Sequence, residues 1–363
     1  MPVPSSLKIF TVFVALLAIG GVGLYLVDIG TAEVPEDTIP LAEAVTPTST
    51  ASSITTSSIM TTSTTMTSTP AKGTLVIQGT GDVNLDPTYI PALATNGYGH
   101  AWEGLEGIFL ADDLTVINLE CAPSGIGAAE PKEFVFRCPP ESLVSLAPAG
   151  IDVASLGNNH SGDYGKRALI DSRDNLIAAG VLPVGAGKDA TEAGAPALSQ
   201  IEGWNVAVLG FGGVFPTPAW FATDDRAGMR DGDDITSMVA AVSAADAAAD
   251  LVVVTVRWGA EFDTEPRTDD IERARAIIAA GADVIFGHHA HRLQPLEMVN
   301  DAAVFWGLGN FVWPRHSTAA ATTAIGRVVV SPDGSIEACL IPAFIESPGQ
   351  PVLTGGPSCG PER

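Results

Sequence analysis

Basic residues are scarce in this sequence. Its 363 residues include 18 Lys and Arg against 42 Asp and Glu, which gives a formal net charge of −24. Nucleic acid and anionic lipid surfaces both attract proteins through Lys and Arg, so this balance argues against either as an electrostatic partner. We expect no nucleic-acid partner, and an anionic polymer would have to be recognised by a local site.

Charged residues are absent from one long stretch near the N-terminus. Residues 9–27 are apolar or small, and a helix needs roughly 20 such residues to cross a bilayer. Lys8 precedes this stretch and no Lys or Arg follows before Lys72, which predicts a cytoplasmic segment at residues 1–8 and an extracytoplasmic remainder. We expect a single-pass anchor in the cell membrane; a signal peptide cleaved near residues 30–32 is the alternative.

Large apolar side chains are rare in residues 28–71, where Thr and Ser dominate. Such a segment cannot bury enough apolar surface to repay the entropy cost of ordering. It is predicted to be a disordered linker that holds the folded part away from the membrane. The hydroxyl groups could carry O-linked sugars, and an unmodified spacer is equally consistent with the composition.

Cysteine is also rare, and no two of the four cysteines are close enough in sequence to suggest a zinc site. All four follow the predicted anchor, in the part of the chain expected to meet an oxidising compartment. Four cysteines allow three pairings. We expect the local one, Cys121 with Cys138 and Cys339 with Cys359.

From residue 74 onward, short runs rich in Val and Ile alternate with turns and helical stretches, which is typical of an α/β fold. Strands are predicted at residues 74–79, 114–118, 152–156, 205–211, 251–256, 283–287 and 302–308, with a closing hairpin at 327–330 and 335–340. Helices are predicted at residues 141–147, 165–179, 234–248 and 269–280. Asp233 or Asp234 is expected to cap the third helix and Thr268 the fourth, which Gly281 would end.

Polar residues collect just after the predicted strands, at the edge where layered α/β folds bind ligands. They are Asp82, Asn84, Glu120, Asn159, His160, Arg257, Glu261, His289, His291 and Asn310. Half of the six histidines fall within residues 288–291. Oxygen and nitrogen ligands without a thiolate suit Mn²⁺, Zn²⁺ or Fe²⁺. Taken singly, each group also has a purely structural explanation. Asp82 and Asn84 could close an Asx turn, and Glu120 could be an exposed loop carboxylate. Asn159 and His160 could form a hydrogen-bonded turn, and the histidines at 288–291 could be a chance surface cluster.

Seven motifs occur in order along the chain: GDVNLD, VINLE, FRCPPE, ASLGNNHSGDYG, VRWGAEF, GADVIFGHHAHRLQPLE and GLGNFVW. This series resembles the CapA family of poly-γ-glutamate capsule proteins, within the calcineurin-like metallophosphatase superfamily, and covers about residues 75–313. The resemblance implies a two-sheet sandwich flanked by helices, which we expect at residues 72–345, before a C-terminal tail at 346–363.

The resemblance also implies a site for one or two divalent metal ions. The expected ligands are Asp82, Asn84, Glu120, Asn159, His289 and His291. His160 resembles the general acid of the superfamily.

Arg257 departs from the family pattern, which has histidine before the Trp258-Gly259 pair. A guanidinium has no free lone pair and stays protonated, so it cannot replace an imidazole ligand. Either one metal position is lost, or Arg257 directs a fixed positive charge at the substrate. A simple ion pair with Glu261 or Asp263 is the third possibility.

By resemblance, the protein is expected to serve poly-γ-glutamate capsule synthesis or export. It would act as a metal-dependent hydrolase or transferase on a phosphoester or on the anionic polymer, beside capsule synthesis membrane proteins. The alternative is a non-catalytic polymer-binding or assembly component that keeps the fold with a degraded metal site.

Overall fold

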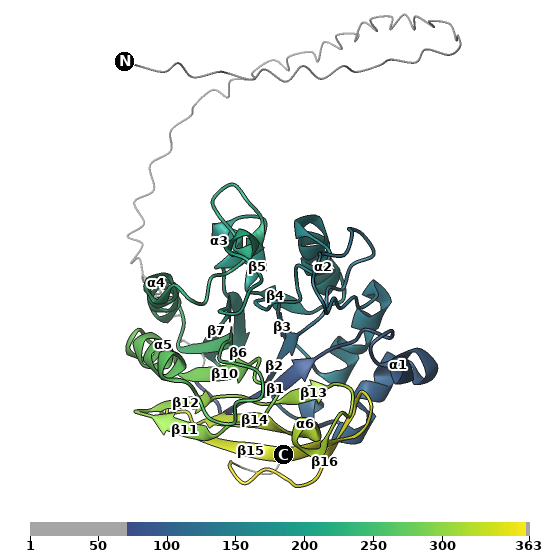
Figure 1. The fold of residues 1–363 in the computed structure, drawn as a ribbon. Helices are drawn as coiled ribbons and strands as arrows, with labels where there is room; N and C mark the ends of the chain where they lie inside the picture. The colour runs from purple at the N-terminus through teal and green to yellow at the C-terminus, as the bar shows by residue number, and fades with distance from the viewer. Residues whose placement is uncertain (1–70, 361–363) are drawn as a thin grey trace, which may run out of the picture. The chain divides into compact units, whose positions relative to one another are not determined.

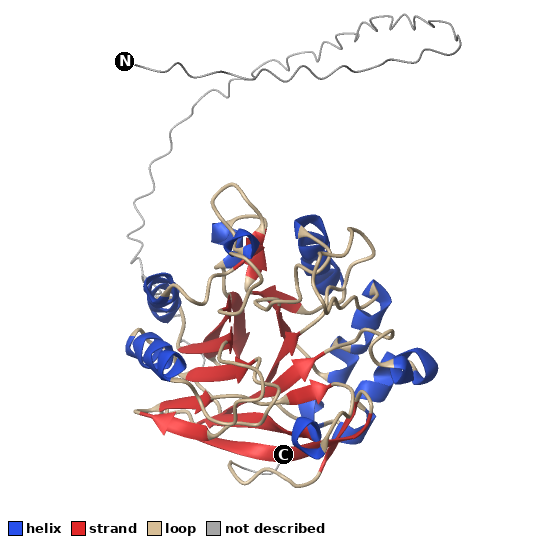
Figure 2. Cartoon of the chain, in the orientation of Figure 1, coloured by secondary structure: helices blue, strands red, loops and turns tan. Residues whose placement is uncertain are grey.

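The computed structural model describes residues 71–360. The predicted anchor at residues 9–27 and nearly all of the predicted linker lie outside the described residues. Among the described helices, none is long and apolar enough to cross a membrane. Figures 1 and 2 show the described part as strands surrounded by helices.

The larger sheet has the strand order β16-β15-β14-β1-β2-β3-β4, with β13 beside β1. Its strands are β1 (Leu75–Val83), β2 (Leu114–Leu119), β3 (Val153–Ser155), β4 (Leu182–Val184), β13 (Asn310–Val312), β14 (Thr322–Val330), β15 (Ile336–Ser347) and β16 (Gln350–Leu353). Strands β1 to β4 are parallel, and β14 to β16 add an antiparallel edge. The parallel half therefore directs successive strand ends to one edge.

The second sheet has the order β11-β12-β10-β9-β7-β6. Its strands are β6 (Ala197–Ile201), β7 (Trp204–Gly212), β9 (Leu251–Arg257), β10 (Val284–His288), β11 (Leu296–Val299) and β12 (Ala302–Phe305). The four central strands are parallel and the two edge strands antiparallel. A separate pair joins β5 (Ala186–Gly187) to β8 (Gly228–Met229).

The two large sheets share one apolar layer, in which Ile77 and Val116 of the first sheet pack with Val208, Val253 and Phe286 of the second. Helices cover both outer faces. The α-helices are α1 (Pro91–Asn96), α2 (Lys166–Ala178), α3 (Ala190–Ala193), α4 (Ile235–Asp246), α5 (Thr268–Ala279) and α6 (Thr318–Ala321). The 3₁₀ helices are η1 (Tyr98–Ala101), η2 (Glu103–Leu105), η3 (Ile108–Leu110), η4 (Pro140–Ser145), η5 (Ala147–Ala149) and η6 (Pro218–Trp220). The expected two-sheet sandwich flanked by helices is therefore present.

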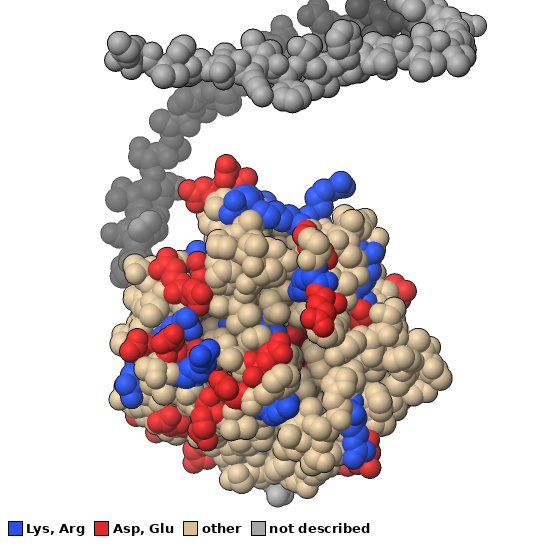
Figure 3. All heavy atoms as spheres, viewed as in Figure 1, with Lys and Arg blue, Asp and Glu red and all other residues tan. Residues whose placement is uncertain are grey.

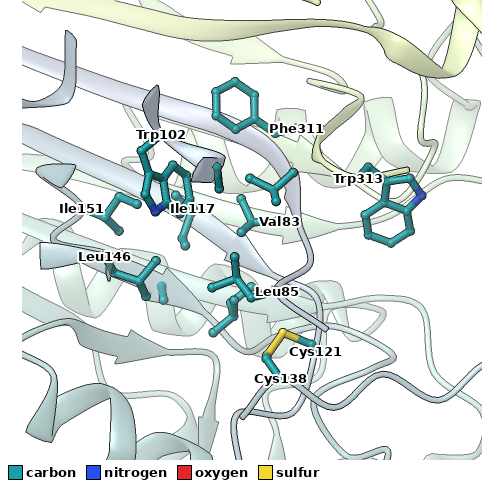
Figure 4. Packing of buried hydrophobic residues seen from close by; sticks show 14 of the residues in the cluster. Val83, Leu85, Trp102, Ile117, Cys121, Cys138, Leu146, Ile151, Phe311 and Trp313 are labelled. Carbon is teal, nitrogen blue, oxygen red and sulfur yellow. A yellow bond between two sulfur atoms is a disulfide. The ribbon is translucent and has the colours of Figure 1, made fainter. Parts of the chain in front are cut away.

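Both predicted disulfides are confirmed: Cys121 bonds to Cys138 and Cys339 to Cys359. Figure 4 shows the first beside Leu85, within the apolar cluster that covers the outer face of the larger sheet. The second fastens the end of the described chain to β15. Strand β15 runs through residue 345 to Ser347 and β16 follows at Gln350–Leu353, so the first part of the expected tail, to residue 353, belongs to the sheet.

Two local predictions were wrong. The helix expected at residues 141–147 consists of the 3₁₀ helices η4 and η5, each with a proline in its first turn. Thr268 is the first residue of α5 and not its cap, because Arg267 occupies the cap position. In α4, by contrast, the Asp234 side chain accepts the backbone N–H of Ser237, as a cap should.

Four aspartates form the same clamp at the N-terminal edges of the two sheets. Each aspartate immediately precedes a parallel strand and makes two hydrogen bonds to the second residue of the neighbouring strand. The backbone N–H of the aspartate donates to the backbone carbonyl of that residue. The aspartate carboxylate in turn accepts a hydrogen bond from the backbone N–H of the same residue. The pairs are Asp113 with Val76, Asp152 with Thr115, Asp250 with Asn205 and Asp283 with Val252, with carboxylate distances of 2.7 to 2.9 Å. The clamps thus satisfy backbone groups where the ladders begin.

Candidate functional site

The opposite ends of the parallel strands carry the predicted site residues. Asp82 lies near the end of β1 and Glu120 directly follows β2. Asn159 and His160 follow β3, and Arg257 ends β9. The fold thus brings residues of both sheets to one place.

Arg257 and Glu120 form a two-pronged ion pair at the centre. The guanidinium donates from Nη1 and Nη2 to the two carboxylate oxygens at 2.7 and 2.6 Å, and both side chains are fully buried. Its Nε donates to the side-chain oxygen of Asn159. This planar fork is the strong form of such a contact. The partner of Arg257 is therefore Glu120, and not Glu261 or Asp263.

Asp82 and His291 form the second half of the centre. The Asp82 Oδ2 lies 3.1 Å from His291 Nδ1, and Asn118 donates to the Asp82 Oδ1 at 2.7 Å. Burial alone would raise the pKa of Asp82, but hydrogen bonds from His288 and His291 and the charge of Arg257 hold it well below its usual range. His291 Nε2 lies 3.7 Å from a Glu120 oxygen, so the imidazole stands between the two carboxylates.

His160 contacts the same carboxylate from another side. Its Nδ1 lies 2.8 Å from the Asp163 carboxylate and its Nε2 3.7 Å from Glu120. Burial chiefly lowers the pKa of His160 to about 4, so the ring is neutral at pH 7. With Nδ1–H donated to Asp163, the Nε2 lone pair is free to accept a proton. The Lys132 ammonium holds this arrangement in place, because it donates to the Asp163 carboxylate at 2.5 Å and to the Asn159 backbone carbonyl at 2.6 Å.

His289 lies beside His291, with ring centroids 6.1 Å apart. The two residues have φ values of 93° and 51°, a left-handed conformation that non-glycine residues rarely adopt and that often marks a functional turn. Burial lowers the pKa of His289, and its buried Nδ1 has no hydrogen-bond partner. The imidazole is therefore neutral and able to act as a ligand.

Asn84 is engaged elsewhere. Its side-chain oxygen accepts the backbone N–H of Asp86 at 2.8 Å, while its buried amide nitrogen has no partner. This is the Asx turn that the sequence also allowed. The oxygen that a metal ligand would use is thus occupied in a local turn.

Within residues 71–360, two sets of side chains have ligand atoms within 4.8 Å of one another and could hold a metal ion. One set is Asp82, Glu120 and His291; the other is Glu261, His289 and His291. The buried Asp82 Oδ2 lies 3.1 Å from the His291 imidazole, which brings two members of the first set side by side as an ion would need. The space between Glu120 and Asn159, however, is filled by the Arg257 guanidinium, so the residues fit one ion there and not a bridged pair.

Sequence reasoning missed several residues that support these contacts. Asp163 follows His160 by one turn, a spacing that could have indicated it, whereas nothing in the sequence pointed to Lys132. His288 has its Nδ1 3.5 Å from Asp82 and its Nε2 3.0 Å from the Thr255 hydroxyl. Asn118 orients Asp82 from the neighbouring strand β2.

A cleft of about 320 Å³ opens over the centre. Glu120, His160 and His291 lie at its floor, and aromatic side chains make up much of its lining. The site is thus open to a small ligand, or to one end of a larger one.

Comparisons with known proteins match residues 76–315 to the family described as bacterial capsule synthesis protein PGA_cap. The chain is 29% identical over 259 residues to PGA biosynthesis protein CapA of Bacillus subtilis, covering 70% of this chain and 67% of that one. It is 31% identical over 209 residues to capsule biosynthesis protein CapA of Bacillus anthracis, covering 57% and 51%. The chain therefore spans about two thirds of the first relative and half of the second.

Among solved structures, the NAD nucleotidase of Haemophilus influenzae matches with a TM-score of 0.45 and 12% identity, over 78% of this chain and 54% of that one. The family match covers the seven motifs, the whole second sheet, and the larger sheet except for β14 to β16. On that match, the chain belongs to the bacterial capsule synthesis protein family PGA_cap.

Proposed function

We propose that this protein is a metal-dependent hydrolase or transferase of poly-γ-glutamate capsule synthesis or export, acting at the cell surface on a phosphoester or on the polymer. One observation carries the proposal. A fixed cation, Arg257, occupies the place between Glu120 and Asn159, while Asp82 and His291 remain available beside it. The centre would thus combine one metal ion with one guanidinium, on a metallophosphatase-type sandwich.

The ion would be held by Asp82, Glu120 and His291, and when bound it would polarise a phosphoryl or acyl oxygen and lower the pKa of a water. Arg257 uses one N–H of each terminal nitrogen on Glu120, and its Nη1 also lies 3.5 Å from Asp82, so the second N–H of Nη2 would be the one offered to an anionic substrate oxygen. His160, oriented by Asp163, would exchange a proton at Nε2. In hydrolysis the water oxygen replaces the leaving oxygen, which departs with the proton.

Cell-surface placement is part of the proposal. Two disulfides in the described part favour an oxidising compartment, and residues 9–27 are apolar enough to anchor the chain. The partners would then be the anionic polymer or a phosphoester and the membrane proteins of capsule synthesis. Protease accessibility of the folded part in intact cells tests this placement.

The decisive experiment measures bound metal and hydrolysis together on the purified full-length protein. We expect Mn²⁺-dependent cleavage of p-nitrophenyl phosphate or its diester, and about one ion per chain, because the two candidate ligand sets share His291. Asp82→Asn should abolish both. Asp301→Asn, an exposed change in a turn, is the control and should alter neither.

The second candidate is a non-catalytic polymer-binding or assembly component. It is favoured by one observation, namely that both oxygens of Glu120 already pair with Arg257. A protein that binds no metal and cleaves neither ester, yet binds poly-γ-glutamate, would establish this candidate instead.

A further inference from the structure

The wall of the cleft is a continuous aromatic surface. The Phe136 ring is tilted against His160, with ring centroids 4.3 Å apart, and against Tyr89, at 4.6 Å. It also meets the edge of Trp313 at 5.7 Å, and Trp313 lies 4.9 Å from His291. The wall therefore runs from one imidazole of the centre to the other.

Two further phenylalanines line the cleft but expose their rings to solvent. Phe134, in the connection after β2, is 54% exposed, and Phe262, in the connection after β9, is 61% exposed. Water-exposed aromatic rings are unfavourable unless something covers them. Their place on the cleft indicates that its ligand does so.

Phe262 is held in its exposed position. Its φ is 72°, a strained value for a bulky residue, and its backbone N–H donates to the Ala290 carbonyl at 2.7 Å. The Arg292 guanidinium lies 4.7 Å from the ring centre and donates to the His291 carbonyl at 2.7 Å. The ring is thus tied to the histidine loop of the centre.

The charges of the cleft do not suit an extended polyanion. Of the described side chains that line it, Arg292 is the one Lys or Arg, against the carboxylates Glu120 and Glu261. On the face drawn in Figure 3, basic atoms lie interspersed with acidic ones and form no continuous strip. Recognition of a polyanion backbone would require a row of such cations.

We propose that the cleft binds a phosphate ester whose alcohol part carries a planar ring, with the phosphate on the floor beside His160 and His291 and the ring against Trp313, Phe134 and Phe262. This deepens the proposed function and rests on it for the position of the phosphate. Stacking on aromatic faces would select the ring. Ester hydrolysis would release the ring-bearing alcohol and inorganic phosphate.

Calorimetric titration of the full-length protein with non-hydrolysable probes tests this. Phenylphosphonate should bind at least about tenfold more tightly than ethylphosphonate. Phe134→Ala with Phe262→Ala should remove most of that difference, because phenylphosphonate binding should weaken far more than ethylphosphonate binding. Leu198→Ala, an exposed apolar residue outside the cleft, is the control and should preserve the difference.

Equal binding of the two phosphonates would overturn the inference, as would tighter binding of a γ-linked glutamate pentamer at this cleft. The outcome is separable from that of the proposed function. Ring-selective binding without any ester cleavage would support the cleft assignment and reject hydrolysis. Cleavage of esters with and without a ring at equal rates would support hydrolysis and reject the assignment of the cleft to a ring.

Discussion

At the scale of single residues, the site depends on where one positive charge sits. Arg257 neutralises Glu120 and lies 3.5 Å from Asp82, so one guanidinium faces two buried carboxylates. Burial raises the pKa of Glu120 to about 7, an effect that the Arg257 charge opposes. Removing the guanidinium would therefore leave an uncompensated buried charge, which is strongly destabilising.

Replacing Arg257 by His should separate its two possible roles. The new imidazole adds a ligand between Glu120 and Asn159, so bound metal should rise from about one toward two ions per chain. Phosphoester binding or turnover should weaken, because a charge-assisted hydrogen bond contributes about 1.5–3 kcal/mol. Metal analysis and kinetics on the one variant measure both, with exposed Arg167→His as the control. Gained metal with unchanged kinetics would show that Arg257 is structural only.

Asp163 is predicted to act through His160. Asp163→Asn would let the amide donate to Nδ1 and move the ring proton to Nε2, so kcat should fall by about a hundredfold with KM little changed. Asp171→Asn is the matched control, because Asp171 is also hydrogen-bonded but lies outside the site. Equal kcat values for the two variants would remove Asp163 from the mechanism.

The residue types of the site could be predicted from the sequence, but their partners could not. The placement of Glu120, His160 and Arg257 after strands followed from the apolar runs alone. That Arg257 pairs with Glu120, 137 residues earlier, depends on how the two sheets face each other, which no local pattern encodes. Lys132 could not be predicted either, because it reaches the site from a loop without regular structure.

At the scale of elements, the strongly apolar strands were predictable and the edge strands were not. Strands β1, β2, β7, β9 and β10 are buried along their whole length or nearly so and read as Val-rich runs. Strands β6 and β11 expose several residues, and β5 and β8 have two residues each. Helix η4 begins at a proline and lacks the length of a stable α-helix.

Two of the aspartate clamps, at Asp283 and Asp250, should change the stability of the fold in opposite directions as the pH changes. Burial raises the folded-state pKa of Asp283 to about 6, above roughly 3.9 in the unfolded chain. Its contribution to stability therefore falls as the pH rises from about 4 to about 6. The free energy of unfolding of Asp283→Asn, relative to that of the wild type, should therefore be higher at pH 7 than at pH 4.5.

Asp250 provides the control for this experiment. Hydrogen bonds from Asn205 and Lys72 lower its pKa, so its contribution is present at neutral pH and is lost in acid. Asp250→Asn should look less favourable at pH 7 than at pH 3, because the contribution of Asp250 is lost only below roughly pH 3.9. Denaturant unfolding of both variants measures the difference, and the same sign for both would contradict the assignment.

At the scale of the whole molecule, the two disulfides should differ in what they support. Each closes a loop of similar length, with sequence separations of 17 and 20, so replacing either pair by serine should cost about 2–4 kcal/mol of stability. Cys121 directly follows Glu120, whereas Cys339 lies in β15. Loss of the first pair should therefore also weaken metal binding.

Metal titration of the two serine variants, at a temperature where both remain folded, measures this difference. The Cys339→Ser, Cys359→Ser variant should retain wild-type metal affinity. Equal loss of affinity in both variants would show that the effect is one of general stability and not of the position of Glu120.

The Arg257–Glu120 pair also affects how the centre obtains its positive charge. A metal ion can be removed by a chelator or exchanged for a competitor, but a guanidinium is carried by the chain itself. One of the two positive positions is therefore filled as soon as the protein folds, whatever ions the surroundings contain. Under the proposed function, metal limitation would thus empty half of the centre and leave the other half intact.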